Sequence, residues 1–376
     1  AGLPSKQSGV GVSGPVLTLY RDTNGWCPFC ERVWLALREK GLEFDEVLIN
    51  LYDKPQWYKD MVPTSLVPAV KFASDGEVVW ESDVILRRLD EAFPETRPLF
   101  ADPGAVEEVN RLTGRVMNAS MGIAYRVGNL TEAQIDERRE GLVAAVGELD
   151  EKLRAAGPFL LGEELSAADC MAVPMLERYG VQMPFTAAGL DLRDAARWPG
   201  LARWYEAMES RPSYAARVQG DAYSWTAVAP VMMRLFGGQN GTLTGEAEAR
   251  ARRAEEAAAS LLRGLGDGSE GEPSPAARTE AAAKIINNRE AVVADATALE
   301  AKSQKELSRL PPSKSPAVDA ALRAVAAALL SGMPPAVPPA STPDVLPADV
   351  AAACRFVAAR LCAPRDMGAP AATALR

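Results

Sequence analysis

The order of apolar and polar positions near the start of the chain predicts alternating strands and helices. An apolar run at residues 16–20 is typical of a buried strand, and residues 30–40 place apolar side chains at helical spacing. Residues 43–48 predict a second strand. A Ser-Asp-Gly turn at residues 74–76 joins two short apolar runs and predicts a hairpin. A helix follows from residue 84, so the predicted order is strand, helix, strand, hairpin, helix.

Helical patterning takes over after a proline-containing linker at residues 94–103 and continues to about residue 237. Within it, Ser166 and Asp169 have the spacing of a capping box, with Asp in the place that Glu or Gln usually takes. An apolar run follows directly, as expected for a helix that begins there. The pattern therefore predicts a mixed α+β domain followed by an all-helical one.

The last part of the chain has a different composition. Residues 241–376 include 37 alanines and a single aromatic residue, Phe356, and their charges sum to zero. Because side chains this small bury little apolar area, at about 25 cal/mol per Å², we expect no independent core here. We expect this extension to pack on the preceding domain or on another protein. Proline-rich breaks separate its helical stretches, which we place at 246–263, 279–309, 317–331 and 348–361.

Composition narrows the function classes. The chain has 376 residues and a net charge of −9, without the basic stripe that nucleic-acid binding requires. No apolar run reaches the ~20 residues needed to span a bilayer. Five cysteines at irregular spacing indicate a reducing intracellular compartment rather than a secreted disulfide framework. The chain has no histidine, which excludes Ser-His-Asp triads, Cys-His pairs and imidazole metal ligands.

The segment Cys27-Pro28-Phe29-Cys30 carries the strongest chemical signal. It lies between the first predicted strand and the first predicted helix, which puts Cys27 at a helix N-terminus. Free backbone N–H groups and the partial positive charge there favour a thiolate, the nucleophile of disulfide exchange. The motif alone leaves two alternatives open. One is half of a zinc site, for which the chain offers no second Cys-x-x-Cys pair, and the other is a pair of inert buried thiols.

Together these features resemble a known family. The Cys-Pro-Phe-Cys unit, Val67-Pro68, Glu81-Ser82 and a helical domain with a capping box resemble a cysteine-type glutathione transferase. The lambda class is the most similar, followed by the omega and dehydroascorbate reductase classes. The resemblance implies a thioredoxin-like α+β domain, an all-α transferase domain and an unrecognised, mostly helical extension. The expected segments are a flexible 1–15, a glutathione-binding 16–100, a helical 101–237 and a docking extension at 238–376.

The resemblance also implies that glutathione is a co-substrate, that Cys27 is the catalytic thiol and that no metal is needed. Val67 would precede a cis-proline, and its backbone would pair with the peptide like an added strand. Ser82, at a helix start, would hold the γ-glutamyl carboxylate. Each of these residues also has a purely structural interpretation. Pro68 could end a strand, residues 81–82 could cap a helix, and Lys54 could be a solvated surface lysine. The implied glutathione contacts are Phe29, Lys54, Val67, Pro68, Glu81 and Ser82.

Cys30 departs from the family pattern, because lambda and omega members usually carry alanine at this place. It either resolves a mixed disulfide on Cys27 or is a buried bystander. The leading hypothesis is a glutathione-dependent thiol transferase that acts on glutathionylated proteins or small oxidised acceptors, in the chloroplast or the cytosol. One alternative is a scaffold with the transferase fold that docks on a larger protein assembly, such as a chloroplast complex, through residues 241–376. Another is a glutathione-ligated iron–sulfur cluster that bridges two chains through Cys27.

Overall fold

The computed structural model divides into two compact units. One consists of residues 1–114 and 148–175, and the other of residues 115–147 and 176–376. Residues 1–13 of the flexible segment expected at 1–15 lie outside the described residues. None of the described helices is long and apolar enough to cross a membrane. The described residues are 14–126, 130–186, 190–238, 241–264, 272–297, 311–333 and 347–376.

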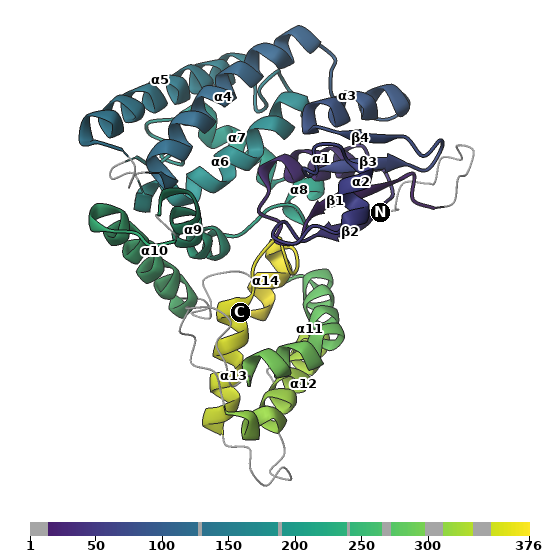
Figure 1. Cartoon of the computed structure of the whole chain (residues 1–376), viewed down its shortest axis with the longest axis vertical. Helices are drawn as coiled ribbons and strands as arrows, with labels where there is room; N and C mark the ends of the chain where they lie inside the picture. Colours follow the sequence, from purple (N-terminus) through teal and green to yellow (C-terminus); the bar gives the residue numbers. More distant parts are fainter. Residues whose placement is uncertain are drawn as a thin grey trace. The chain divides into compact units, whose positions relative to one another are not determined.

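The first unit contains a four-stranded sheet with the order β2-β1-β3-β4 (Figure 1). β1 (Leu17–Asp22) pairs in parallel with β2 (Phe44–Ile49). On its other side, β1 runs antiparallel to β3 (Ala69–Phe72), which forms the predicted hairpin with β4 (Val78–Trp80). This is the expected thioredoxin-like order. The helices of this region are α1 (Pro28–Glu39), α2 (Gln56–Met61) and α3 (Ser82–Ala92).

Buried contacts fix the end of β1 against its neighbours. The Arg21 side chain is 2% exposed, and its Nη2 donates to Oε2 of Glu46 on β2 at 2.8 Å. Its guanidinium also lies 4.2 Å from the ring centroid of Trp34 on α1. A buried guanidinium that is paired and stacked in this way holds three elements together. The Cys-x-x-Cys segment follows directly, so these contacts set its position.

Within the helical region, α6 begins at the capping residues that the sequence predicts. At the start of α6, the carboxylate of Asp169 accepts hydrogen bonds from the backbone N–H and the hydroxyl of Ser166, at 2.9 and 2.8 Å. The predicted capping box is therefore present, with Asp replacing Glu or Gln. The helices are α4 (Pro103–Tyr125), α5 (Glu132–Ala156), α6 (Ala167–Thr186), α7 (Pro199–Glu209), α8 (Pro212–Ala215) and α9 (Ala222–Gly237).

A buried carboxylate organises part of the second unit. Glu177 of α6 is 2% exposed and accepts hydrogen bonds from the indole N–H of Trp225, the hydroxyl of Tyr214 and the backbone N–H of Gly220. Each donor satisfies a lone pair that burial would otherwise leave unpaired. The carboxylate thus ties α6 to α8 and to the start of α9.

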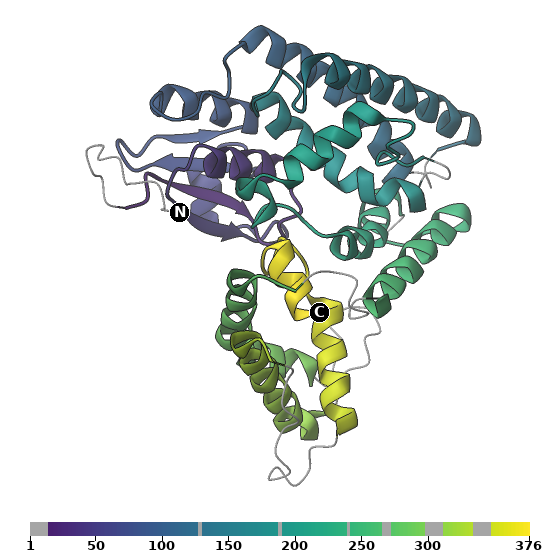
Figure 2. The ribbon, with the colours of Figure 1, turned by 180° about the vertical axis from the view of Figure 1, so that it is seen from behind.

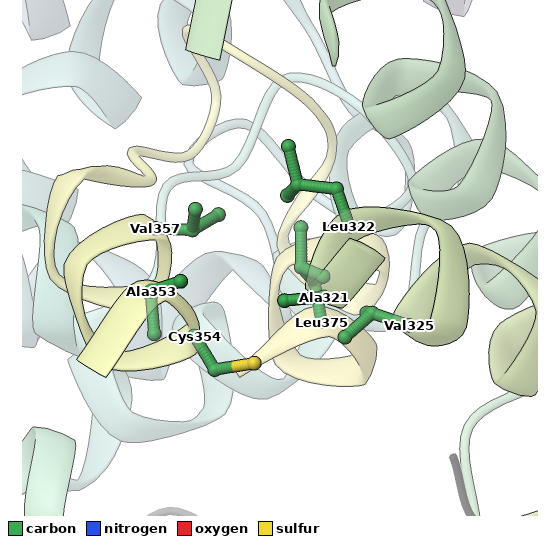
Figure 3. Close-up of a pocket in the computed structure, with 8 residues that line it drawn as sticks. Ala321, Leu322, Val325, Ala353, Cys354, Val357 and Leu375 are labelled. Carbon is green, nitrogen blue, oxygen red and sulfur yellow. The ribbon is translucent and has the colours of Figure 1, made fainter. Parts of the chain in front are cut away.

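The extension contains its own apolar core, so the expectation that it has none is wrong. Its helices are short of aromatic residues, but alanine faces let them approach closely enough to enclose Ile285, Leu322 and Phe356. α11 lies against α12 and α14, and α12 lies against α13 (Figure 2). Figure 3 shows an apolar pocket in this core, into which the Cys354 side chain projects. The helices are α10 (Gly245–Gly264), α11 (Pro275–Ala296), α12 (Ser315–Ser331), α13 (Pro347–Arg360) and α14 (Ala369–Leu375).

These helices correspond to the predicted stretches, with two differences. The helix predicted at 279–309 begins earlier, because Ser274 caps it by accepting the backbone N–H of Ala277 at 3.2 Å. It ends at Ala296, and residues 298–309 of the predicted stretch lie outside the described residues. The helix α14 was not predicted.

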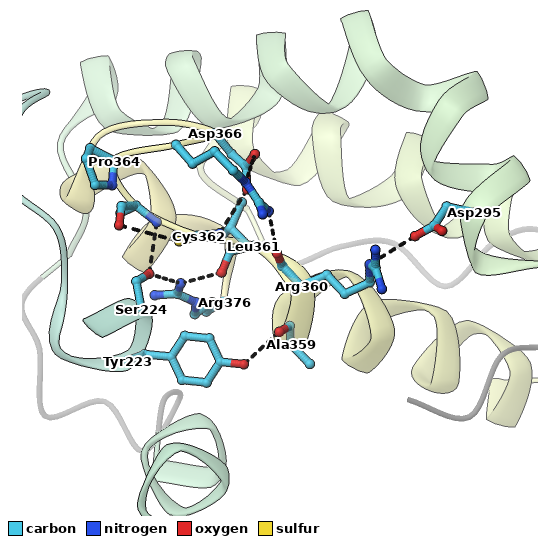
Figure 4. A network of polar contacts seen from close by, with 12 residues as sticks. Tyr223, Ser224, Asp295, Ala359, Arg360, Leu361, Cys362, Pro364, Asp366 and Arg376 are labelled. Carbon is cyan, nitrogen blue, oxygen red and sulfur yellow. Dashed lines mark hydrogen bonds and ion pairs between the residues drawn. The ribbon is translucent and has the colours of Figure 1, made fainter. Parts of the chain in front are cut away.

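The extension also packs on the preceding helical domain, which confirms the first of the two packing expectations. The Ala363 backbone N–H donates to the Ser224 hydroxyl of α9 at 2.9 Å, and the Tyr223 hydroxyl donates to the Ala359 carbonyl at 2.7 Å (Figure 4). Arg376, whose side chain is 1% exposed, pairs with Asp221 at the start of α9. The end of the described chain is therefore fastened to α9.

Candidate active site

Cys27 occupies the N-cap position of α1. β1 ends at Asp22, and the chain turns through Gly25, whose φ of 65° lies in the region that favours glycine. Pro28 then begins the helix, where its missing N–H costs no hydrogen bond. The Cys27 side chain is half-buried, so its sulfur is sheltered but accessible.

The pKa of the Cys27 thiol lies below its ordinary value. The largest cause is the hydrogen bond from the Cys30 thiol, and the backbone N–H groups of Cys30 and Phe29 act in the same direction. Burial and the negative charge of Asp22 oppose the shift. The donors prevail, which is the direction that a helix N-terminus predicts.

Cys30 behaves in the opposite way. Its side chain is 2% exposed, and burial raises its pKa well above the ordinary value. The hydrogen bond to Cys27 and the charges of Cys27 and Asp22 raise the pKa further. Cys30 therefore stays protonated and directs its S–H at the Cys27 sulfur. The predicted placement, with Cys30 facing Cys27 across the first helical turn, is present in the structure.

A second segment approaches the Cys27 sulfur from the start of β3. The Val67–Pro68 peptide bond is cis, as predicted. The Cys27 Sγ lies 3.9 Å from the Val67 carbonyl oxygen, which accepts its hydrogen bond when the thiol is protonated. The structure thus brings Val67, Pro68 and Cys27 together.

Lys54 and Tyr58 hold the loop that leads to Val67. The Lys54 ammonium donates to the Ser65 carbonyl at 2.8 Å, and the Tyr58 hydroxyl donates to the Leu66 carbonyl at 2.6 Å. Lys54 is therefore more than a solvated lysine, because it is anchored two residues from Val67.

The start of α3 brings the other predicted residues close to α1. Glu81 stands just before the helix with a φ of 68°, an uncommon conformation for a residue with a side chain, and its side chain makes no capping hydrogen bond. Ser82 is 5% exposed and accepts a hydrogen bond from Nη1 of Arg32 at 3.4 Å. The Arg32 guanidinium also lies 5.0 Å from the ring centroid of Phe29. Sequence reasoning assigned no role to Arg32, which links the motif helix to Ser82.

Comparison with known proteins agrees with this geometry. The family model "Glutathione S-transferase, N-terminal domain" matches residues 26–92, and "Glutathione S-transferase, C-terminal domain" matches residues 132–207. Glutathione S-transferase DHAR2 of Arabidopsis thaliana is 36% identical over 160 residues, which cover 41% of this chain and 68% of that protein. The chain belongs to the glutathione S-transferase family.

Two further relatives show the breadth of the likeness. Glutathione S-transferase DHAR3, chloroplastic, of Arabidopsis thaliana is 32% identical over 40% of this chain and 54% of its own length. Glutathione S-transferase omega-1 of Mus musculus is 29% identical over 50% of this chain and 75% of its own length. The resemblance to cysteine-type glutathione transferases is thus confirmed. Both family models end before the extension, whose helices lie beyond residue 244.

Sequence reasoning missed one residue of this transferase, Asp22. Its side chain is 1% exposed, and one carboxylate oxygen accepts the backbone N–H groups of Trp26 and Cys27, at 2.8 and 3.3 Å. A carboxylate oxygen and the sulfurs of Cys27 and Cys30 all lie within 4.8 Å of one another. A closed zinc site needs four protein ligands, and this cluster supplies three from the described residues. The position of Asp22, at the end of the strand before the motif, was the signal that could have identified it.

Proposed function

We propose that this chain is a glutathione-dependent thiol transferase in which Cys27 is the nucleophile. The observation that carries the proposal is the lowered pKa of a half-buried thiol that lies beside the cis Val67–Pro68 peptide. A thiolate attacks a disulfide sulfur, and the thiol with the lower pKa leaves more readily. The site therefore suits disulfide exchange better than the addition of glutathione to electrophiles.

The proposed reaction has two exchange steps. The Cys27 thiolate attacks the glutathione sulfur of a glutathionylated acceptor, the acceptor sulfur leaves and takes a proton, and a mixed disulfide remains on Cys27. A second glutathione then attacks this disulfide as the thiolate. Glutathione disulfide is released, and Cys27 returns as the thiolate. Overall, one free glutathione and the glutathionyl group of the acceptor become glutathione disulfide, and the acceptor is released as a thiol.

We propose the glutathione contacts that the family resemblance implies, and the geometry around Cys27 is consistent with them. Val67 would pair through its backbone with the cysteinyl part of the peptide, next to Pro68 and the Phe29 ring. Ser82, at the first position of α3, would receive the γ-glutamyl carboxylate, and Glu81 the amine. Lys54, anchored at Ser65, would face the glycine carboxylate. Binding of glutathione to the Ser82→Ala and Lys54→Met variants, measured by calorimetry, tests these contacts one by one.

The decisive experiment measures reduction of the adduct between hydroxyethyl disulfide and glutathione. Cys27→Ser should reduce turnover to the background, because serine gives no thiolate. Cys354→Ser is the matched control, since burial raises the pKa of that thiol and it lies in the extension. Turnover by Cys27→Ser equal to that of the unmodified protein would overturn the proposal.

The compartment and any protein partner are separate proposals. A relative is named chloroplastic, and we propose the chloroplast or the cytosol, both reducing compartments. The comparisons give the scaffold alternative no support. A partner that binds the extension would have to use a face left free by α9, since Ser224 and Asp221 already hold the chain's end. Co-purification that is lost on truncation near residue 240 would reveal such a partner.

A further inference from the structure

The buried carboxylate of Asp22 lies beside the thiol pair and has one oxygen that accepts no hydrogen bond from the described residues. One oxygen, Oδ2, accepts the Trp26 and Cys27 backbone N–H groups, while the other, Oδ1, is buried and has no hydrogen-bond partner among the described residues. An unsatisfied buried oxygen is costly and uncommon, and such groups often have a chemical role. One carboxylate oxygen of Asp22 and the sulfurs of Cys27 and Cys30 all lie within 4.8 Å of one another.

We propose, on the basis of the thiol transferase function above, that Asp22 accepts the proton of Cys30 when Cys30 resolves the mixed disulfide on Cys27. In the resting protein, the Cys30 thiol is hydrogen-bonded to the Cys27 sulfur, and this bond favours the Cys27 thiolate. Once Cys27 carries glutathione, its sulfur has no negative charge, and this acceptor is weakened. The Asp22 carboxylate then becomes the charged acceptor close to the Cys30 thiol.

The step balances as follows. The Cys30 sulfur attacks the Cys27 sulfur, and its proton passes to the Asp22 carboxylate. The bond between the Cys27 sulfur and glutathione breaks, and glutathione leaves as the thiolate. A Cys27–Cys30 disulfide forms, with no net change in oxidation state. Two further glutathione molecules later reduce this disulfide to the two thiols and leave as glutathione disulfide, and Asp22 returns its proton to the solvent.

Other charged or titratable groups near Asp22 are less suited to this role. The Arg21 guanidinium donates to the Asp22 backbone carbonyl at 3.1 Å, but it is already paired with Glu46. The Tyr58 hydroxyl uses its proton on Leu66, and burial, together with the charges of Cys30 and Cys27, raises its pKa. Glu31 is buried and adjacent to Cys30 in the sequence, so it is the carboxylate against which Asp22 has to be tested.

The test loads the full-length protein with glutathione disulfide and follows glutathione release from Cys27 by mass spectrometry in a single turnover, without added thiol. Release should require Cys30, and Asp22→Asn should slow it about 10²-fold at neutral pH, the scale of a general base. Glu31→Gln should leave release unchanged. Iodoacetamide should label Cys27 in Asp22→Asn at least as fast as in the unmodified protein. The Asp22 charge raises the Cys27 pKa, so its removal favours the thiolate. A merely structural defect would slow both reactions.

The outcomes separate this inference from the function on which it rests. The role of Asp22 is overturned if Asp22→Asn or Cys30→Ser releases glutathione at the rate of the unmodified protein. It is also overturned if Glu31→Gln slows release and Asp22→Asn does not. A protein that never acquires glutathione on Cys27 refutes the proposed function instead. If Asp22→Asn does not fold, the pH dependence of release from the unmodified protein decides. A nearly constant rate from pH 6.5 to 8.5 supports a carboxylate base, and a tenfold rise per pH unit overturns it.

Discussion

The N-termini of α1 and α9 each hold a group that can carry negative charge, but the two groups are stabilised by different partners. At α1, Cys27 is stabilised by N–H and S–H donors from Phe29 and Cys30. At α9, Asp221 caps the helix by accepting the Ser224 backbone N–H at 2.7 Å, and it is also paired with the guanidinium of Arg376. Both ends use the same helix polarity.

The difference shows what makes a helix N-terminus reactive. The cap of α9 is a carboxylate with a permanent cation beside it, so its charge is satisfied and it fastens the extension to the helical domain. The cap of α1 is a nucleophile stabilised by N–H and S–H donors without a cation. These donors can stay beside the sulfur while it forms and breaks bonds. The same helix polarity therefore supports a structural ion pair between Arg376 and Asp221 in one place, called the clasp below, and a candidate catalytic thiol in the other.

Removing the cation at α9 should have the largest effect. Arg376→Ala leaves the Asp221 carboxylate, 14% exposed, without its partner, and we expect a loss of about 3 kcal/mol in the free energy of unfolding. The Leu361 carbonyl also loses the donor that Arg376 supplies at 2.8 Å. Denaturant titration followed by circular dichroism measures the loss.

Arg323→Ala is the matched control for this prediction. Arg323 pairs with Asp319 on the same helix, and its side chain is 60% exposed, so its removal should change stability by about 0.5 kcal/mol or less. Equal effects of the two variants would show that the clasp at α9 is no stronger than a surface ion pair.

The second prediction asks whether the clasp fastens a folded unit or a loose one. Ile285 is 6% exposed in the core of the extension, whereas its neighbour Ile286 is 51% exposed. Ile285→Ala should cost about 2–4 kcal/mol, because it leaves a cavity, and Ile286→Ala about 0.5 kcal/mol or less. Thermal unfolding of the two variants measures the difference. Similar losses would mean that the extension has no packed core.

The third prediction compares two thiols directly. Cys354 lies within α13, where burial raises its pKa, whereas donors at α1 lower the pKa of Cys27. Both side chains are half-buried, so exposure does not separate them. Iodoacetamide should alkylate Cys27 at least about tenfold faster than Cys354 at pH 7, since the thiolate is the reacting form. Peptide mapping by mass spectrometry resolves the two rates, and equal rates would contradict the comparison.

The sequence predicted the parts of this site that depend on local signals. Pro28 and the apolar spacing after Cys30 are enough to place Cys27 at a helix start, and the family resemblance implied the cis peptide at Val67–Pro68. The order of the strands along the chain also followed from local apolar patterns and from the turn at residues 74–76.

The hydrogen-bond environment of individual polar groups could not be predicted. Asp22 lies five positions before Cys27, and nothing in its own sequence shows that one of its oxygens is left unsatisfied beside two sulfurs. The core of the extension was missed for a related reason. The buried area per residue is small in alanine-rich helices, but close approach of their alanine faces lets a few larger residues, such as Leu322 and Phe356, be buried. That packing depends on tertiary geometry, which composition does not contain.

The smallest predicted effect is the most direct test of the sign of the two pKa shifts. The folded pKa of Cys27 is lowered, so its thiolate adds stability that is fully present above the unfolded pKa of about 8.5 and is lost as the pH falls through the folded pKa. The folded pKa of Cys354 is raised, so its thiol adds stability below about pH 8.5 that is lost as the pH rises through its folded pKa. The stability difference between the unmodified protein and Cys27→Ser should therefore grow as the pH rises toward about 8.5. The difference for Cys354→Ser should shrink above pH 8.5. Urea titrations at each pH measure both slopes, and slopes of the same sign would show that α1 does not stabilise a thiolate.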